Sequence, residues 1–283
     1  MQNLLNYVNS FILGIIQGIT EWLPVSSTGH LLIWQGFTGD LISGEFSEMF
    51  NVVVQFGSIL AVVVLFWNKL FPFSPKKTVQ ERNEVYSLWS KVIVAVAPAG
   101  VIGVLLDDWI DSVFFNQYVV SATLIIYGVL FIVIENRNKS RTPATSVIPQ
   151  LTYKTALLIG CFQLLALIPG TSRSGTTILG AIILGCSRNV AAEFSFFMAV
   201  PVMLGASALK MLKYLKNGME FIGLHEWLVL FVGMATAFVV SIFALKFLVG
   251  YVRKHDFKAF GYYRIVLGIV LILYFAFKPC FAG

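Results

Sequence analysis

The stretch Gln17-Gly-Ile-Thr-Glu-Trp-Leu-Pro-Val-Ser-Ser-Thr-Gly-His30 sets a carboxylate, several hydroxyls and an imidazole between apolar segments. A related stretch, Pro169-Gly-Thr-Ser-Arg-Ser-Gly-Thr-Thr177, lies further along the chain at an offset of 146 residues, which pairs Ser26 with Ser172. We call residues 17–30 the first polar segment and residues 169–177 the second polar segment. Two related polar segments in an apolar chain predict one active site built from both.

The composition predicts an integral membrane protein. The chain is 58% hydrophobic and only 12% charged, with a mean hydropathy of +0.82, so a soluble fold would lack polar cover. The net charge of +6 is scattered among loops with no basic helix face, which argues against nucleic acid as a partner. The three cysteines form no CxxC pair and have no histidine cluster, so neither a zinc site nor a disulfide framework is indicated.

Short apolar runs flank both polar segments. Residues 4–19 and 31–37 flank the first, and residues 155–168 and 177–184 flank the second. A membrane-spanning helix needs about 20 apolar residues, so these runs are too short to cross on their own. Each pair predicts a re-entrant helix hairpin, which is tolerated only where protein or water covers its turn.

Longer apolar runs predict six full spans, and the chain is therefore expected to be an all-α polytopic membrane protein. The predicted spans are 50–67, 89–106, 114–134, 194–215, 227–248 and 259–277.

A second correspondence indicates a duplication. Glu45-Phe-Ser47 recurs as Glu193-Phe-Ser195, and these residues either supply acidic charge to helix N-termini or brace the hairpins. One hairpin plus three spans is an odd number of crossings, so the second repeat would enter the membrane inverted. We expect one transmembrane domain over 1–283, with repeats at about 1–137 and 150–283 joined by a cytoplasmic linker at about 138–149.

The distribution of basic residues predicts the orientation. Residues 68–91, 135–154 and 251–264 hold 13 of the 20 basic residues and fall on one side of the predicted topology. The positive-inside rule places these segments in the cytoplasm and both termini outside.

The first polar segment carries candidate catalytic groups. Gln17 and Glu21 are spaced i, i+4 and project from one helix face, and a carboxylate at membrane depth is a functional candidate by default. His30 follows Ser26 and Ser27 closely, so it can act as a base, an acid or a nucleophile. The alternative is that Glu21 and His30 are structural residues held by an ion pair or a hydrogen bond.

The second polar segment carries an arginine and helix-capping hydroxyls. Small hydroxyl residues before a short helix cap it, and the exposed N–H groups there bind anions. Arg173 favours the anion interpretation, because its planar guanidinium suits two oxygens of a phosphate. Together the two segments predict a site for phosphate or another anion, with a divalent cation that Glu21 helps to bind.

Three motifs resemble the undecaprenyl-pyrophosphate phosphatase family, the bacterial bacitracin-resistance membrane proteins. They are Gln17-Gly-Ile-Thr-Glu21, the Pro-Val-Ser-Ser-Thr-Gly-His sequence of residues 24–30, and the second polar segment. The resemblance implies hydrolysis of undecaprenyl diphosphate to the monophosphate and inorganic phosphate in the bacterial plasma (inner) membrane, with bacitracin resistance. It also implies a divalent cation, Mg²⁺ or Ca²⁺, and a site that faces the extracytoplasmic side.

The resemblance also implies roles for individual residues. Ser27, His30 and Glu21 would be catalytic, with Glu21 as the metal ligand and Gln17 as a supporting residue where the family also uses glutamate. Either Ser27 attacks phosphorus with His30 as its base, or His30 attacks directly or activates water. The residues expected to hold the substrate phosphates are Ser26, Ser172, Arg173, Ser174 and Thr177.

Two other functions fit the residues. A transporter or flippase of a phosphate-bearing lipid would have the same repeats and anion site. A membrane scaffold would have Glu21 and Arg173 as a structural ion pair. The expected partners are a polyprenyl diphosphate lipid and the bilayer, and the sequence leaves a homodimer open.

Overall fold

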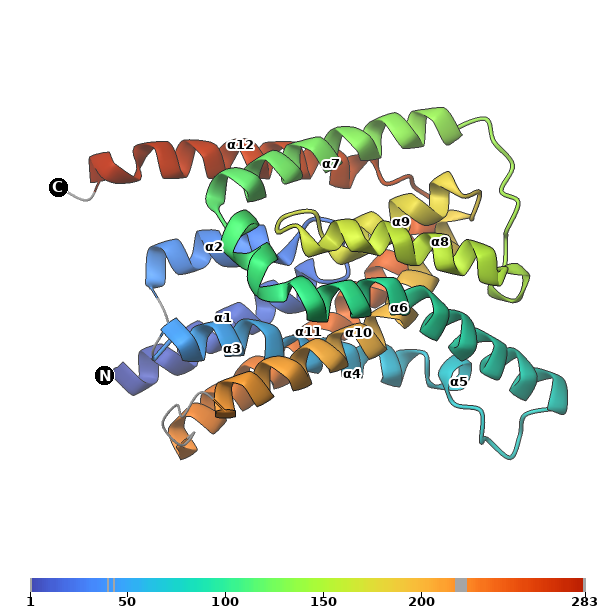
Figure 1. The fold of residues 1–283 in the computed structure, drawn as a ribbon, viewed down its shortest axis with the longest axis horizontal. Helices are drawn as coiled ribbons and strands as arrows, with labels where there is room; N and C mark the ends of the chain where they lie inside the picture. Colours follow the sequence, from blue (N-terminus) through green and yellow to red (C-terminus); the bar gives the residue numbers. More distant parts are fainter. Residues whose placement is uncertain (1, 40, 43, 217–222, 282–283) are drawn as a thin grey trace.

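A computed structural model describes residues 2–39, 41–42, 44–216 and 223–281. These residues form helices and no strand, as Figure 1 shows. The α-helices are α1 (Gln2–Thr20), α2 (Ser27–Thr38), α3 (Gly44–Val53), α4 (Gln55–Leu65), α5 (Trp67–Leu70), α6 (Val79–Phe114), α7 (Gln117–Asn138), α8 (Tyr153–Gln163), α9 (Arg173–Ile183), α10 (Arg188–Lys216), α11 (Leu224–Val252) and α12 (Lys258–Phe281). Two 3₁₀ turns, η1 (Ile148–Gln150) and η2 (Leu164–Leu167), flank α8.

The prediction of a polytopic membrane protein is confirmed. Within the described ranges, six helical segments are long and apolar enough to cross a bilayer. They are α3 with α4, the first 28 residues of α6, α7, α10, α11, and α12 as far as Phe277. The helices extend beyond the predicted spans, and α6 in particular begins at Val79, before the predicted span 89–106.

The two predicted hairpins are present, and they enter the bundle from opposite ends. In Figure 1, α1 runs inward from the end that holds both termini and α2 returns to that end, while α8 and α9 do the same from the other end. The serine that precedes each returning helix has a positive φ, 73° at Ser26 and 69° at Ser172. A serine with a positive φ costs about 1–3 kcal/mol, which contacts in the surrounding structure must offset. Both hairpins therefore turn at the same strained position.

Small residues let the hairpins approach the spanning helices. α1 packs along α11 and α8 packs along α6, and α7 packs along α12. A Cβ on Gly14 would lie 2.6 Å from the Gly233 carbonyl oxygen, and a Cβ on Gly160 would overlap the backbone of Ala95. Helix association in lipid depends on such close packing, because lipid tails are as apolar as leucine.

We expect Gly160→Ala to destabilise the protein by about 1–3 kcal/mol, because the added methyl group forces α8 away from α6. The measurement is the Tm of the detergent-solubilised protein. Gly205→Ala is the matched control, since no described atom lies within 4 Å of its added methyl group. Alanine also favours a helix over glycine by about 1 kcal/mol, so the control should keep or raise the Tm. Equal losses in both variants would contradict the close approach of α8 to α6.

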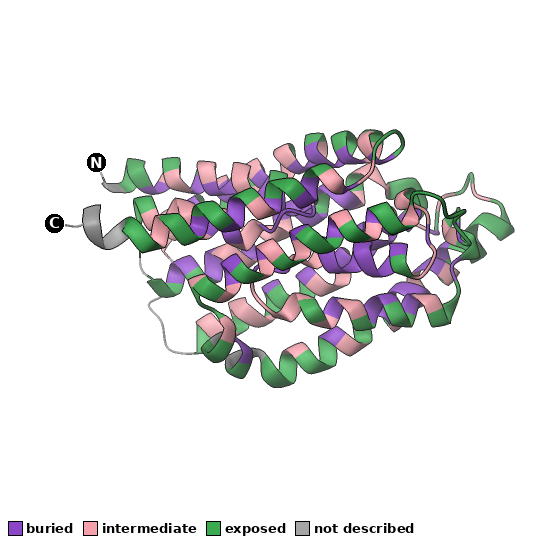
Figure 2. Cartoon of the chain, turned by 90° about the horizontal axis from the view of Figure 1, so that it is seen from above, coloured by how far each residue is buried: buried purple, intermediate pink, exposed green. Residues whose placement is uncertain are grey.

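The turns of both hairpins lie in the middle of the bundle. Figure 2 shows buried residues running through this middle, with exposed residues over the outer helix faces. Trp22 of the first turn is fully buried with Phe194 and Phe196 of α10 in the largest hydrophobic core. The serines of the repeated Glu-Phe-Ser contact the returning helices of the hairpins. Ser47 accepts a hydrogen bond from Gln35 of α2 at 3.2 Å, and the Ser195 hydroxyl bonds the Thr177 hydroxyl of α9 at 2.7 Å.

Three expectations about charged and polar residues need correction. Lys91 and Arg264 were counted among the cytoplasmic basic residues at the edges of two predicted spans, but both are buried inside helices, Lys91 in α6 and Arg264 in α12. His225 lies between the predicted spans 194–215 and 227–248, where the sequence predicts a solvated side chain, but it is part-buried and bonds Asn6 at 3.2 Å and Tyr7 at 3.1 Å. The side chains of the predicted acidic turn at Asp107, Asp108 and Asp111 lie outside the described residues.

Candidate functional site

The structure brings the two polar segments together at the turns of the hairpins. Ser174 Oγ of α9 donates a hydrogen bond to the Glu21 backbone carbonyl at 3.0 Å. Arg173 Nη2 lies 3.2 Å from Glu21 Oε1, and both side chains are nearly buried, at 10% and 8% exposed. Residues 152 positions apart in sequence therefore share one polar site.

Three side chains donate hydrogen bonds to the Glu21 carboxylate. Gln17 Nε2, one helical turn earlier, donates to Oε2 at 3.0 Å. Ser27 Oγ donates to the same oxygen at 3.3 Å, and Arg173 holds Oε1. Together these donors compensate the charge of a buried carboxylate, which would otherwise cost several kcal/mol.

Arg173 spans two oxygen acceptors. Its Nη2 holds Glu21 and its Nη1 donates to the Ser195 carbonyl of α10 at 2.9 Å. The guanidinium also lies 5.9 Å from the centre of the Trp22 ring. This is the ion pair that the scaffold interpretation requires, so the pair by itself does not separate a structural role from phosphate binding.

The hydroxyls of α9 hold protein atoms. The Ser172 Oγ accepts from the Gly175 N–H at 3.2 Å and caps the helix. The buried Thr177 Oγ1 bonds the Ser195 Oγ at 2.7 Å and donates to the Arg173 carbonyl at 2.8 Å. Ser172, Ser174 and Thr177 thus fix the second turn around Arg173, although the sequence suggested direct phosphate ligands.

The N-terminus of α2 differs from that of α9, because the described structure gives it no side-chain cap. The Ser26 side-chain oxygen is buried and has no hydrogen-bond partner in the described part of the chain. Uncapped N–H groups and the helix dipole attract anions. A phosphate at this end would lie beside Ser27, the first residue of α2.

His30 is held by groups other than Ser27. Its Nδ1 lies 2.8 Å from the Ser26 carbonyl oxygen, which can only accept, so this nitrogen carries the hydrogen. In the neutral ring, Nε2 then accepts from the Tyr263 hydroxyl at 2.7 Å, and the two rings stack 5.6 Å apart at 7°. Among the described side chains, His30 makes no hydrogen bond to Ser27, and the base that contacts Ser27 is Glu21.

Two residues of α12 belong to the site and were missed from the sequence. Tyr263 holds His30, and nothing in an apolar run distinguishes it from other membrane tyrosines. Arg264 is fully buried and donates to carbonyls of both turns. It could have been found, because a charge inside the predicted span 259–277 is a functional signal in its own right.

The oxygen donors at Glu21 fit the implied divalent cation. No group of three or more His, Cys, Asp or Glu side chains occurs in the described ranges, so an all-protein cage is not present there. Gln17 Oε1, however, is buried without a hydrogen-bond partner in the same ranges, beside the Glu21 carboxylate and the Ser27 hydroxyl. Mg²⁺ and Ca²⁺ prefer such oxygen ligands, and Mg²⁺ is often completed by substrate phosphates.

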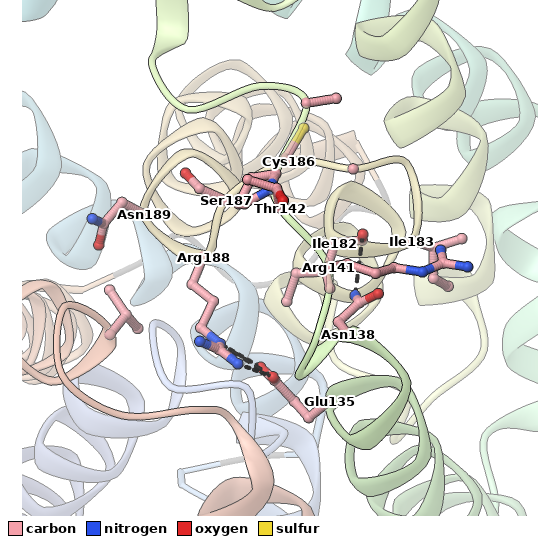
Figure 3. A pocket seen from close by; sticks show the side chains of 14 residues that line it. Glu135, Asn138, Arg141, Thr142, Ile182, Ile183, Cys186, Ser187, Arg188 and Asn189 are labelled. Carbon is pink, nitrogen blue, oxygen red and sulfur yellow. Dashed lines mark hydrogen bonds and ion pairs between the residues drawn. The ribbon is translucent and has the colours of Figure 1, made fainter.

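A cavity away from the hairpin turns is lined by a different set of residues. A cavity of about 410 Å³ lies beside the ion pair of Glu135 and Arg188 (Figure 3). Arg188 Nε lies 3.0 and 3.1 Å from the two Glu135 oxygens, and the Phe257 N–H donates to the same carboxylate. This pair joins α7, α10 and the α11–α12 connection.

Burial raises the pKa of the nearby Cys186 thiol to about 11, which keeps it protonated and unreactive.

The sequence comparisons identify the family of the chain. The family described as "Bacitracin resistance protein BacA" matches residues 10–270. A protein of Acetivibrio thermocellus named undecaprenyl-diphosphatase is 58% identical over 96% of this chain and 98% of its own length. Undecaprenyl-diphosphatase of Enterococcus faecalis is 55% identical over 96% and 99%. Undecaprenyl-diphosphatase 1 of Clostridioides difficile is 58% identical over 96% and 97%. The chain therefore belongs to the BacA family.

Proposed function

We propose that this protein hydrolyses undecaprenyl diphosphate to undecaprenyl monophosphate and inorganic phosphate, which recycles the carrier lipid of cell-wall synthesis and confers bacitracin resistance. The observation that carries the proposal is the contact of Ser27 with the Glu21 carboxylate, 3.3 Å away, beside an arginine from the other hairpin. The proposed nucleophile Ser27, the proposed base Glu21 and the Arg173 guanidinium thus lie together near the N-terminus of α2. Relatives that share more than half of the sequence carry the corresponding enzyme name.

The arrangement suggests a sequence of steps. The terminal phosphate binds at the N-terminus of α2, and the Arg173 guanidinium turns from Glu21 to its oxygens. Glu21 accepts the Ser27 proton as Oγ attacks the terminal phosphorus, and the anhydride bond to the lipid monophosphate breaks. Water then attacks the phosphorus of the phosphoserine, Glu21 returns its proton to the leaving Ser27 Oγ, and inorganic phosphate is released. Direct attack by His30 would first require its Nε2 to leave the Tyr263 hydroxyl.

A divalent cation would be held by Glu21, with Gln17 Oε1 and the Ser27 hydroxyl as neighbouring oxygen donors. When bound, it would supply positive charge to the oxygens of the transferring phosphoryl group. Gln17 then has a role of its own, because its amide N–H group orients the carboxylate while its buried oxygen has no hydrogen-bond partner in the described structure and is left to serve as a ligand.

We also propose that the chain is a pair of inverted repeats, about 1–137 and 150–283, joined by a cytoplasmic linker at 138–149. The matching strained serines and the reciprocal packing of each hairpin on the other repeat support this arrangement. The basic connections of residues 71–78 and 139–152 lie at the end opposite to both termini (Figure 1). The positive-inside rule then puts the termini outside and turns the α1–α2 hairpin toward the extracytoplasmic face of the plasma (inner) membrane.

Phosphate release from a polyprenyl diphosphate by purified protein in detergent tests the proposal. We expect release that stops with a chelator and resumes when Mg²⁺ or Ca²⁺ is added, because the site has one carboxylate and relies on the metal for further charge. Detergent removes the sealed membrane, so transport alone cannot give this signal. Tight binding of the lipid without phosphate release would favour the transporter or flippase and would overturn the proposed function.

A further inference from the structure

Arg264 is a fully buried arginine without an acidic partner. Its side chain is 0% exposed in α12. None of the ion pairs between described residues includes it, and its Nε has no hydrogen-bond partner in the described structure. Of the other buried charged groups in the described core, Glu21 pairs with Arg173 and Glu135 pairs with Arg188. Lys91 of α6 donates to the Pro149 carbonyl at 3.3 Å and, like Arg264, is in none of these ion pairs. Arginine stays protonated in proteins, so Arg264 leaves a positive charge inside the bundle.

This charge lies between the two hairpin turns. Arg264 Nη1 donates to the Pro24 carbonyl of the first turn at 3.2 Å. Its Nη2 donates to the Gly170 and Thr171 carbonyls of the second turn at 2.9 and 3.0 Å. A Cβ on Gly175, in the first turn of α9, would lie 3.2 Å from Nη1.

The surrounding groups leave the site positive. Glu21 and Arg173 neutralise each other, and the N-termini of α2 and α9 add partial positive charge. Carbonyl oxygens supply hydrogen-bond acceptors to Arg264 but no full negative charge. A buried charge with no counter-charge normally costs more than its contacts return, so a purely structural tie between the turns would be better made by a neutral side chain.

We propose that Arg264 supplies the positive charge with which the site binds the diphosphate of its substrate, while its three hydrogen bonds keep the two turns in register. The anion completes the charge balance that the protein leaves open. The proposal rests on the proposed function only for the identity of that anion. Its consequence is that Arg264 determines affinity for multiply charged phosphates, even though it lies outside both polar segments.

Binding of inorganic pyrophosphate to the purified full-length protein tests the charge, because this probe carries the diphosphate without a lipid. Arg264→Gln keeps an amide that can donate to the turn carbonyls but removes the charge. We expect its pyrophosphate Kd to rise about tenfold or more, with a Tm within a few degrees of the wild type. Arg264→Lys keeps the charge and should keep most of the affinity.

Arg188→Gln is the matched control, since it removes an arginine from the ion pair at the far end of the bundle. It should lower the Tm, because it leaves the buried Glu135 carboxylate without its positively charged partner. It should leave the pyrophosphate Kd unchanged, because Arg188 contacts neither hairpin turn in the described structure. Four results would overturn the proposal: no pyrophosphate binding by the wild type, unchanged affinity in Arg264→Gln, equal losses in the Gln and Lys variants, or failure of Arg264→Gln to fold. Phosphate release from the lipid, measured in parallel, reports separately on the proposed function.

Discussion

Ser27→Ala is expected to release phosphate from a polyprenyl diphosphate at least about 1,000-fold more slowly than the wild type, since loss of a nucleophile removes the covalent route. Ser27 lies at the start of α2, where a bound phosphate would meet the helix dipole, and its hydroxyl already contacts a carboxylate base. The variant removes one small, part-buried hydroxyl, so its Tm should stay near that of the wild type. The measurement is the initial rate at saturating substrate.

His30→Ala separates the serine route from the histidine route. His30 bonds Ser26 and Tyr263 and stands outside the contact between Ser27 and Glu21. Its removal should therefore cost clearly less than the removal of Ser27. Rapid acid quenching of the wild type should also trap an acid-stable phosphoserine. Near-normal turnover of the Ser27 variant, or an acid-labile phosphoenzyme that disappears with His30, would rule out the serine route.

The second large effect is expected at Arg173, where Arg173→Lys should lower kcat/KM by about 100-fold to 1,000-fold, as loss of a preorganised donor does in other enzymes. The guanidinium now spans Glu21 and Ser195 with two different nitrogens, and it can offer the same two to phosphate oxygens. A single ammonium nitrogen cannot reproduce that fork. Because lysine keeps the charge beside Glu21, the variant should remain folded.

Arg188→Lys provides the matched control, because it makes the same substitution in the ion pair with the buried Glu135, away from the two hairpin turns. It should retain phosphate release. By contrast, Arg173→Ala would leave Glu21 buried without its counter-charge and should lose about 3–5 kcal/mol of stability. Its loss of activity would then combine unfolding with the loss of the guanidinium. Full activity of Arg173→Lys together with a lowered Tm would instead favour the structural interpretation of the Glu21–Arg173 pair.

The elements of the fold could be predicted because hydropathy is a property of consecutive residues. The hairpins and spans follow from the lengths of the apolar runs, and the offset of 146 residues indicated that the polar segments belong together. The same approach counted Arg264 with the cytoplasmic basic residues, because it lies near the start of the predicted span 259–277. Only the packing of α12 on α7 reveals that this arginine is buried.

The roles within the site were harder to predict because they depend on tertiary contacts. Thr177 reads as a phosphate ligand from its motif, yet its hydroxyl is taken by Ser195 of another helix. His30 reads as the partner of Ser27 from its position, yet Tyr263 lies 233 residues away and holds its Nε2. A motif reports which chemical groups are available, whereas hydrogen-bond partners decide the direction in which each group acts.

The position of Tyr263 indicates how a lipid substrate would reach the site from the bilayer. Its side chain bonds His30 on one edge and remains 48% exposed on the outer face of α12. One aromatic ring therefore separates the imidazole from the surroundings of the bundle, which in a bilayer are acyl chains. A polyprenyl diphosphate would need to pass only its headgroup sideways between α2 and α12, while its isoprenyl tail stays dissolved in the lipid. Such a route spares the molecule the cost of bringing a long hydrocarbon through water.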